Sequence, residues 1–154
     1  MGVVKEITEP EARSALCSAI LADLTDWFGR PDATEAYIEA IAGLTTFAWE
    51  VDGMQAGFAA LSRPTNETFD VHVLGVLRQY HGRGGGRALL AAGEDHARAA
   101  GAVFLSVQTV GPSASDPFYE KTRAFYGSCG MAAMAEFPDY WGRGTPMLLM
   151  AKAI

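Results

Sequence analysis

The chain has 154 residues, of which 49% are hydrophobic and 19% are charged, a composition typical of a globular protein and unlike that of a disordered one. The formal net charge of −6 argues against a broad nucleic-acid-binding surface. The sequence contains no run of eighteen apolar residues and no secretory signal, and we therefore expect no membrane association. These features predict a single domain over residues 1–154, located in the cytoplasm.

The first half of the chain alternates between helix and strand signals. Thr8 precedes Pro10 and Glu11, which favours a helix capped by Thr8 and running to about Leu24. Asp52-Gly53 lies between two apolar segments and predicts a β-hairpin. In this half we expect helices up to residue 24 and over 33–42, and strands over 3–7, 45–51, 54–62 and 68–77.

The second half continues this pattern after a glycine-rich loop. An Ala/Leu-rich segment ends at Gly101 and predicts a helix over 87–100. A further helix is expected over 118–129, and strands over 103–110, 131–136 and 147–152. The predicted fold class is therefore α/β in the broad sense (α+β), with a mostly antiparallel, mixed seven-stranded sheet flanked by four helices.

Residues 82–86 contain four glycines, preceded by His81 and accompanied by Arg83 and Arg87. A strand, a glycine loop and a helix together form an anion site, because unpaired N–H groups and the positive end of the helix dipole meet there. The sequence matches neither a Walker loop nor a dinucleotide-binding fingerprint. The alternative, that the glycines form only a tight turn, does not account for four glycines and the neighbouring arginines.

The segment VLGVLRQYHGRGGGRALL (residues 73–90) resembles the acetyl-coenzyme A signature of the GCN5-related N-acetyltransferase (GNAT) superfamily. Gly84 and Gly86 match the two glycines of that signature, and His81 stands where the family has Gln or Arg. The segment AFYGSCGM (residues 124–131) resembles a second family motif. The order of predicted elements agrees with the family over the whole chain.

This resemblance implies that acetyl-CoA is the acyl donor and that no metal takes part. The residues that it implies for binding acetyl-CoA are Leu74, Val76, His81, Gly82, Arg83, Gly84, Gly85, Gly86, Arg87 and Tyr126. Main-chain groups around Leu74 and Val76 would pair with the pantetheine arm and the acyl carbonyl. Tyr126 would face the sulfur. A phenol has a pKa of about 10 and a thiol a pKa of about 8.5, so proton transfer from Tyr126 to the thiolate is unfavourable. We therefore expect a hydrogen bond shared between the Tyr126 hydroxyl and the sulfur.

His72 is the candidate for the base that takes the proton of an amine acceptor. Strand alternation puts it on the same face as Asp70 and Leu74, and an ordinary imidazole pKa of about 6.5 suits this role. The alternative is a core histidine held by a backbone carbonyl. Asp70 would either orient His72 or bind the acceptor amine.

Two aromatic loops border the acceptor side by the same resemblance. Trp27 lies in the first loop, and Glu136 and Trp141 belong to the second, where charge and cation–π contacts would bind a cationic amine. Exposed aromatic residues here are equally consistent with a homodimer interface. The sequence does not separate these readings.

The predicted function is N-acetyltransfer from acetyl-CoA to a primary amine of a small molecule or peptide, by direct attack in a ternary complex. Cys17 and Cys129 fit no metal spacing and no covalent-intermediate role, and we expect both to be buried thiols. The alternatives are a protein-amine acetyltransferase and a non-catalytic acyl-CoA-binding regulatory module.

Overall fold

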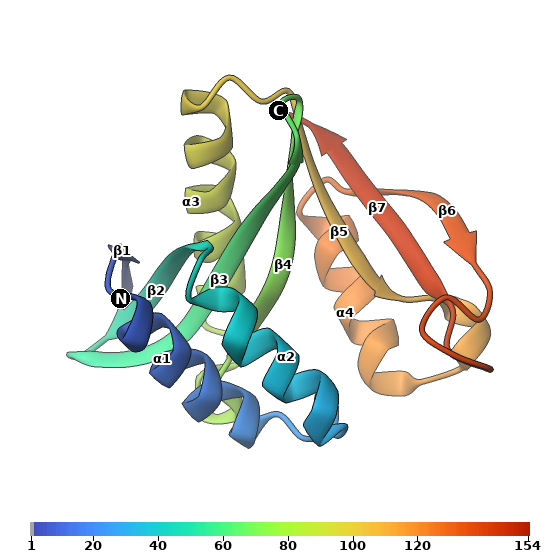
Figure 1. Ribbon diagram of the computed structural model, residues 1–154, viewed down its shortest axis with the longest axis horizontal. Helices are drawn as coiled ribbons and strands as arrows, with labels where there is room; N and C mark the ends of the chain where they lie inside the picture. The colour runs from blue at the N-terminus through green and yellow to red at the C-terminus, as the bar shows by residue number, and fades with distance from the viewer. Residues whose placement is uncertain (1) are drawn as a thin grey trace. The chain divides into compact units, whose positions relative to one another are not determined.

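The computed structural model describes residues 2–154, which form two compact units. The first unit comprises the chain up to Ser62 together with Val71–His96, and the second comprises Arg63–Asp70 and Ala97–Ile154. Figure 1 labels the helices and strands. The helices are α1 (Pro10–Asp23), α2 (Pro31–Ile41), α3 (Gly85–Ala99) and α4 (Pro117–Ser128). The strands are β1 (Gly2–Ile7), β2 (Thr45–Val51), β3 (Met54–Thr65), β4 (Thr68–Val76), β5 (Phe104–Val110), β6 (Ala132–Phe137) and β7 (Met147–Ala153).

The seven strands have the hydrogen-bonded order β1-β2-β3-β4-β5-β7-β6. This arrangement confirms the predicted fold class, a mixed seven-stranded sheet with four helices. Strand β4 is shared: its residues up to Asp70 belong to the second unit, and Val71–Val76 belong to the first. No helix within residues 2–154 is long and apolar enough to cross a membrane.

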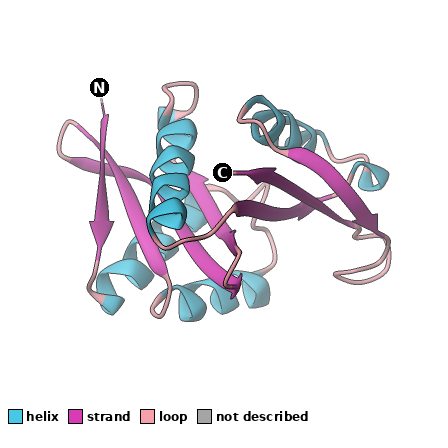
Figure 2. Ribbon diagram, turned by 90° about the horizontal axis from the view of Figure 1, so that it is seen from above, coloured by secondary structure: helices cyan, strands magenta, loops and turns pink. Residues whose placement is uncertain are grey.

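In the first unit, the β2–β3 hairpin forms where the sequence predicts it. Asp52 and Gly53 have φ values of 51° and 78°, as a two-residue hairpin turn with two left-handed residues requires. Helices α1 and α2 lie on one face of the strands and α3 lies on the other (Figure 2). The close packing of α1 depends on Gly75, because a Cβ atom there would lie 3.0 Å from Leu24 Cδ1.

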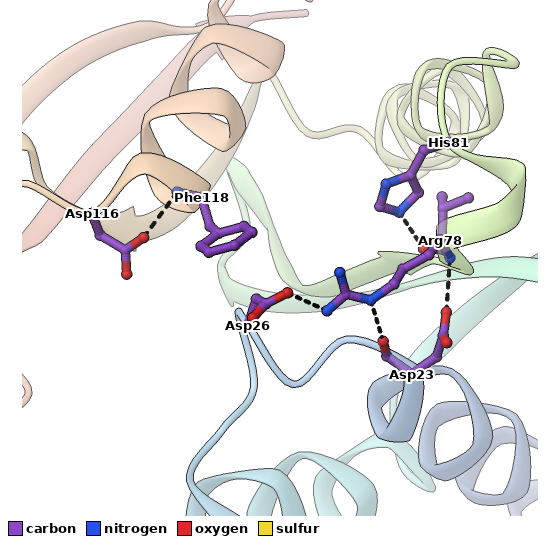
Figure 3. Close-up of polar contacts among 7 residues, drawn as sticks. Asp23, Asp26, Arg78, His81, Asp116 and Phe118 are labelled. Carbon is purple, nitrogen blue, oxygen red and sulfur yellow. Dashed lines mark hydrogen bonds and ion pairs between the residues drawn. The ribbon is translucent and has the colours of Figure 1, made fainter.

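In the second unit, β5, β7 and β6 form antiparallel pairs. Helix α4 lies along β5, and Arg123 Nη1 donates a hydrogen bond to the Val110 carbonyl at 2.8 Å. Asp116 caps this helix, because its carboxylate accepts a hydrogen bond from the N–H of Phe118 at 2.9 Å (Figure 3).

Four sequence-based expectations about helices and strands need correction. Helix α2 begins at Pro31 and not at residue 33. Thr8 does not cap α1: the residue at the cap is Glu9, and no side chain bonds there. Strand β3 extends to Thr65, beyond the predicted end at Ser62. Helix α3 begins at Gly85 and not at Arg87, so two of the loop glycines form its first turn.

The start of α3 at Gly85 has a packing reason. A Cβ atom on Gly85 would lie 2.4 Å from Trp49 Cε3, and Trp49 is itself only 3% exposed. The indole ring therefore takes the space that a side chain would need, and the low helix propensity of glycine is overridden by tertiary contact.

This contact predicts that Gly85→Ala lowers the free energy of unfolding by about 1–3 kcal/mol, the usual cost of overpacking a buried site. Gly127→Ala is the matched control, because it lies in α4 with no atom within 4 Å of a new Cβ. Removing a helical glycine there should be neutral or stabilising. Urea denaturation measures both variants, and equal stability of Gly85→Ala and the wild type would contradict the packing argument.

Candidate functional site

The glycine loop that joins β4 to α3 contains two left-handed backbone positions. Gly82 has φ +77° and Gly84 has φ +86°, conformations that other residues adopt only with strain. The first helical hydrogen bond of α3 runs from the N–H of Ala88 to the carbonyl of Gly84. The N–H groups of Gly85, Gly86 and Arg87 therefore belong to the helix start, where the helix itself offers no acceptors and the dipole is positive.

The basic residues around this loop divide into two groups. Arg83 and Arg87 are exposed, and the Arg83 guanidinium lies over the Tyr80 ring at 5.0 Å from its centroid. Arg78, in contrast, forms an ion pair with Asp26 and hydrogen bonds with Asp23 (Figure 3). The Arg78 guanidinium is thus bound to the end of α1, whereas that of Arg83 contacts a ring within its own segment of the chain.

His81, predicted to contact the cofactor, is attached to the end of β4. Its Nε2–H donates to the carbonyl of Val76 at 2.6 Å, so that this nitrogen carries the proton in the neutral ring. The ring also meets Trp27 edge-on, with 5.9 Å between the ring centroids. This arrangement brings together three predicted site residues in the first unit, His81, Val76 and Trp27.

The predicted alternation along β4 is present. Val71, Val73 and Gly75 are buried, whereas Asp70, His72 and Leu74 are half-buried on the opposite face. Val76 departs from this pattern, because it is buried at 9% exposure. The polar face of β4 therefore carries the predicted base and one predicted backbone contact to the acyl donor.

Sequence reasoning missed Tyr37 on α2. Its ring meets the His72 ring edge-on at 5.4 Å, and it also meets Phe28 at 5.8 Å. In the sequence, Tyr37 has the spacing of a core-facing residue, so that nothing distinguishes it from Ile38 or Ile41. The contact links the α1–α2 connection and α2 to His72 through aromatic rings.

In the second unit, Tyr126 is the buried residue of α4, with 6% of its surface exposed. Its ring lies 5.3 Å from that of Phe125, and its carbonyl accepts a hydrogen bond from the N–H of Met131. A single phenol is thus placed in the interior of this unit by a helix whose start is fixed by the Asp116 cap.

Two predicted acceptor-side carboxylates of the second unit have protein partners. Ser106, which is buried at 8% exposure, donates its hydroxyl to Asp70 Oδ1 at 2.7 Å. Glu136 accepts hydrogen bonds from both the N–H and the hydroxyl of Ser113, at 3.1 Å and 2.8 Å. The Glu136 carboxylate also lies against Gly111, where a Cβ atom would be 2.1 Å from Oε2. Glu136 therefore holds the 3₁₀ turn Pro112–Ala114 in place.

Trp141 belongs to an aromatic cluster at the β6–β7 connection. Its ring contacts Tyr140 at 5.6 Å, and Tyr140 contacts Phe137 at 6.1 Å. Phe137 and Tyr140 are 43% and 52% exposed. The Asp139 carboxylate accepts a hydrogen bond from the N–H of Gly144 and stabilises the loop.

Both cysteines are free thiols, but only Cys17 is buried as predicted. Burial raises the pKa of the Cys17 thiol to about 12, which keeps it protonated and unreactive. Cys129 is half-buried, a correction to the prediction, because α4 ends beside it and leaves its side chain partly accessible. Within residues 2–154, no group of three His, Cys, Asp or Glu side chains is placed to hold a metal ion.

Comparison with known proteins gives a family match and several similar structures. The model of the acetyltransferase (GNAT) family matches residues 14–125. No curated protein matches the sequence significantly. A GNAT-family protein from Desulfovibrio desulfuricans has a TM-score of 0.84 at 21% identity, over 99% of each chain.

Two further structures carry named activities. An aminoglycoside 6'-N-acetyltransferase complexed with coenzyme A has a TM-score of 0.78 at 16% identity, over 98% of this chain and 96% of that one. The ribosomal-protein-S18-alanine N-acetyltransferase from Escherichia coli has a TM-score of 0.74 at 19% identity, over 100% of this chain and 94% of that one. At these identities the likeness is one of fold.

Proposed function

The chain belongs to the acetyltransferase (GNAT) family, and from this premise we propose that it transfers the acetyl group of acetyl-CoA to a primary amine of a small molecule. The transfer is a direct attack within a ternary complex. The observation that carries the proposal is the glycine loop, in which Gly82 and Gly84 turn the chain into the N-terminus of α3. The similar aminoglycoside 6'-N-acetyltransferase, which was solved with coenzyme A, supports the choice of donor.

We assign the pyrophosphate of acetyl-CoA to the loop. The N–H groups of the α3 start provide donors, and Arg83 and Arg87 provide positive charge in a chain that is acidic overall. Gly82, Gly84 and Gly86 allow close approach to the main chain, Gly85 contributes its N–H at the helix start, and His81 holds the loop to β4. The main-chain groups of Leu74 and Val76 pair with the pantetheine arm.

In the chemical step, the amine nitrogen forms a bond to the acetyl carbon and the bond from that carbon to sulfur breaks. The amine must lose a proton, because an alkylamine with a pKa of about 10 is mostly ammonium near neutral pH. His72 takes this proton, directly or through a water molecule. The hydroxyl of Tyr126 hydrogen-bonds to the departing sulfur, which leaves as the thiolate of CoA and then takes up the second proton that the acceptor nitrogen loses on becoming an amide.

A cationic acceptor is favoured by the charge of α2. Its exposed residues include Asp32, Glu35 and Glu39, and the helix contains no Lys or Arg. Together with the rings of Trp27 and Tyr37, this surface attracts and retains an amine by charge and cation–π contact. In the second unit, Asp70, Glu136 and Trp141 are the proposed acceptor-side residues.

We further propose that residues 1–154 act as one N-acetyltransferase domain in the cytoplasm, without a metal, nucleic acid or membrane. The exposed aromatic rings at the β6–β7 connection serve either the acceptor or a homodimer, and a mass measurement in solution distinguishes these two uses.

An amine screen that monitors thiol release from acetyl-CoA tests the proposal. The panel contains aminoglycosides, polyamines and peptides with a free N-terminus or a lysine. Release with a small amine supports the proposal, and release with peptides alone would favour a protein-amine acetyltransferase, the activity named for the similar Escherichia coli enzyme. Binding of acetyl-CoA without release for any amine would favour a regulatory module.

The loop assignment predicts how acetyl-CoA binding depends on charge. Arg83→Gln and Arg87→Gln should each raise the Kd for acetyl-CoA about tenfold, because each removes about one charge-assisted hydrogen bond. Each should also make the Kd less dependent on salt concentration. Gly86→Val should abolish binding by blocking the main chain. Lys5→Gln, at an exposed ion pair on β1, is the control and should bind normally. Isothermal calorimetry at several salt concentrations measures the effect, and unchanged affinity and salt dependence in both arginine variants would refute the assignment.

The role of Tyr126 predicts a loss of turnover without a loss of binding. Tyr126→Phe should lower kcat by roughly ten- to a thousandfold, the range for a removed proton-transfer or leaving-group contact. The Kd for acetyl-CoA should change little, because the ring is retained. A kcat equal to that of the wild type would remove Tyr126 from the chemistry.

The role of His72 predicts an acidic limb in the pH profile of kcat/KM. Activity should fall below a pKa of roughly 6 to 7, because the protonated imidazole cannot accept a proton. His72→Ala and His72→Asn should both lose this limb and recover part of the activity at high pH, where free amine is abundant. If His72→Asn instead retains full activity, the histidine is structural.

A further inference from the structure

Arg78 lies where the chain leaves β4, and the end of α1 binds both its main chain and its side chain. The N–H of Arg78 donates to Asp23 Oδ2 at 2.8 Å, and its Nε donates to the carbonyl of Asp23, also at 2.8 Å. Its Nη2 forms an ion pair with the carboxylate of Asp26 (Figure 3). These contacts join residues more than fifty positions apart in the sequence.

The end of α1 explains why an arginine is suited to this position. The last carbonyl groups of a helix have no partners within the helix, and they carry the negative end of its dipole. The last turn of α1 contains no basic residue of its own, and Asp23 adds a negative charge there. The planar guanidinium of Arg78 satisfies a carbonyl and a carboxylate at the same time.

The same arginine also contacts Trp27. The guanidinium carbon lies 5.5 Å from the centre of a Trp27 ring, and the His81 ring meets the indole edge-on. The main-chain N–H of Trp27 donates to the Leu24 carbonyl, which fixes the main chain of Trp27 at the end of α1. Two residues of the segment that leads into the glycine loop therefore contact one residue of the α1–α2 connection.

We propose that Arg78 is a positioning residue that couples the glycine loop to Trp27. An anion bound at the loop then changes the arrangement of Trp27 in the α1–α2 connection. The inference rests on the proposed function, which assigns the loop to the cofactor and Trp27 to the acceptor side. Arg78 belongs to the basic cluster of the loop in sequence. Its guanidinium, however, pairs with the Asp26 carboxylate and the Asp23 carbonyl, and we do not assign it to a phosphate.

Coupling of this kind has a kinetic consequence. If acetyl-CoA binding favours the arrangement of Trp27 that receives the amine, the affinity for the amine rises when acetyl-CoA is bound, and linkage requires the reverse effect to be equal. Without Arg78 the KM for the amine rises, while the binding of acetyl-CoA is retained.

Fluorine NMR of protein labelled with 5-fluorotryptophan tests the coupling with coenzyme A as the probe and without an acceptor. The chain has three tryptophans, and Trp→Phe variants assign their resonances. In the wild type, coenzyme A should shift the Trp27 resonance and also that of Trp49, which lies against Gly85. In Arg78→Gln, the Trp49 resonance should still shift and the Trp27 resonance should not.

Calorimetry provides the accompanying readout. The Kd of Arg78→Gln for coenzyme A should stay within about fivefold of the wild type, the range for loss of an exposed ion pair. A phosphate-binding role would instead weaken binding in the manner of Arg83→Gln and reduce its salt dependence. Asp26→Asn removes the ion pair from the other side and should reproduce the loss of the Trp27 response. Lys5→Gln should leave that response intact.

Two results would overturn the inference while leaving the proposed function in place. The first is a Trp27 resonance that does not respond to coenzyme A in the wild type although the Trp49 resonance does. The second is a Trp27 response that persists in both Arg78→Gln and Asp26→Asn. Absence of coenzyme A binding in the wild type would instead refute the proposed function, and the inference with it.

Discussion

The turn from β4 into α3 is the constraint on which the rest of the candidate site depends. The main chain can make this turn because Gly82 and Gly84 adopt positive φ values, and it can then begin a helix against Trp49 because Gly85 has no side chain. The result is a set of main-chain N–H groups at one helix start, next to two exposed arginines. A single backbone feature thus fixes the position of the anion site that we propose.

The basic residues near this turn have different physical roles. The Arg83 guanidinium lies over the Tyr80 ring, whereas that of Arg78 forms an ion pair with Asp26 and donates to the Asp23 carbonyl at the end of α1. His81 ties the loop to β4 through the Val76 carbonyl. The sequence presents all of these residues as one positive cluster. The structure shows that Arg78 and His81 hold neighbouring segments together, which the sequence does not indicate.

Local patterns in the sequence predict most of the fold. The Asp52-Gly53 turn and the alternation along β4 depend on neighbouring residues, and both are present in the structure. The start of α3 was predicted two residues late, because the contact between Gly85 and Trp49 joins distant parts of the chain. Helix propensity alone carries no information about such a contact.

The candidate site was less predictable from the sequence, because its contacts also join distant parts of the chain. The contact of Tyr37 with His72 and the hydrogen bonds of Glu136 with Ser113 depend on tertiary structure. A motif can indicate Gly84 and Gly86 as candidate site residues, because their spacing follows from the loop itself. Whether a carboxylate such as Glu136 meets a substrate or a turn depends on which segment folds against it.

Hydrogen exchange at the glycine loop is the most direct test of the central claim, that this loop binds the pyrophosphate of acetyl-CoA. The amides of residues 82–88 are followed with and without acetyl-CoA, by mass spectrometry or NMR. The account predicts that acetyl-CoA slows exchange most strongly at the N–H groups of Gly85, Gly86 and Arg87, because they become hydrogen-bonded to the ligand. Binding of acetyl-CoA that leaves these amides unprotected, with protection only elsewhere in the chain, would contradict it.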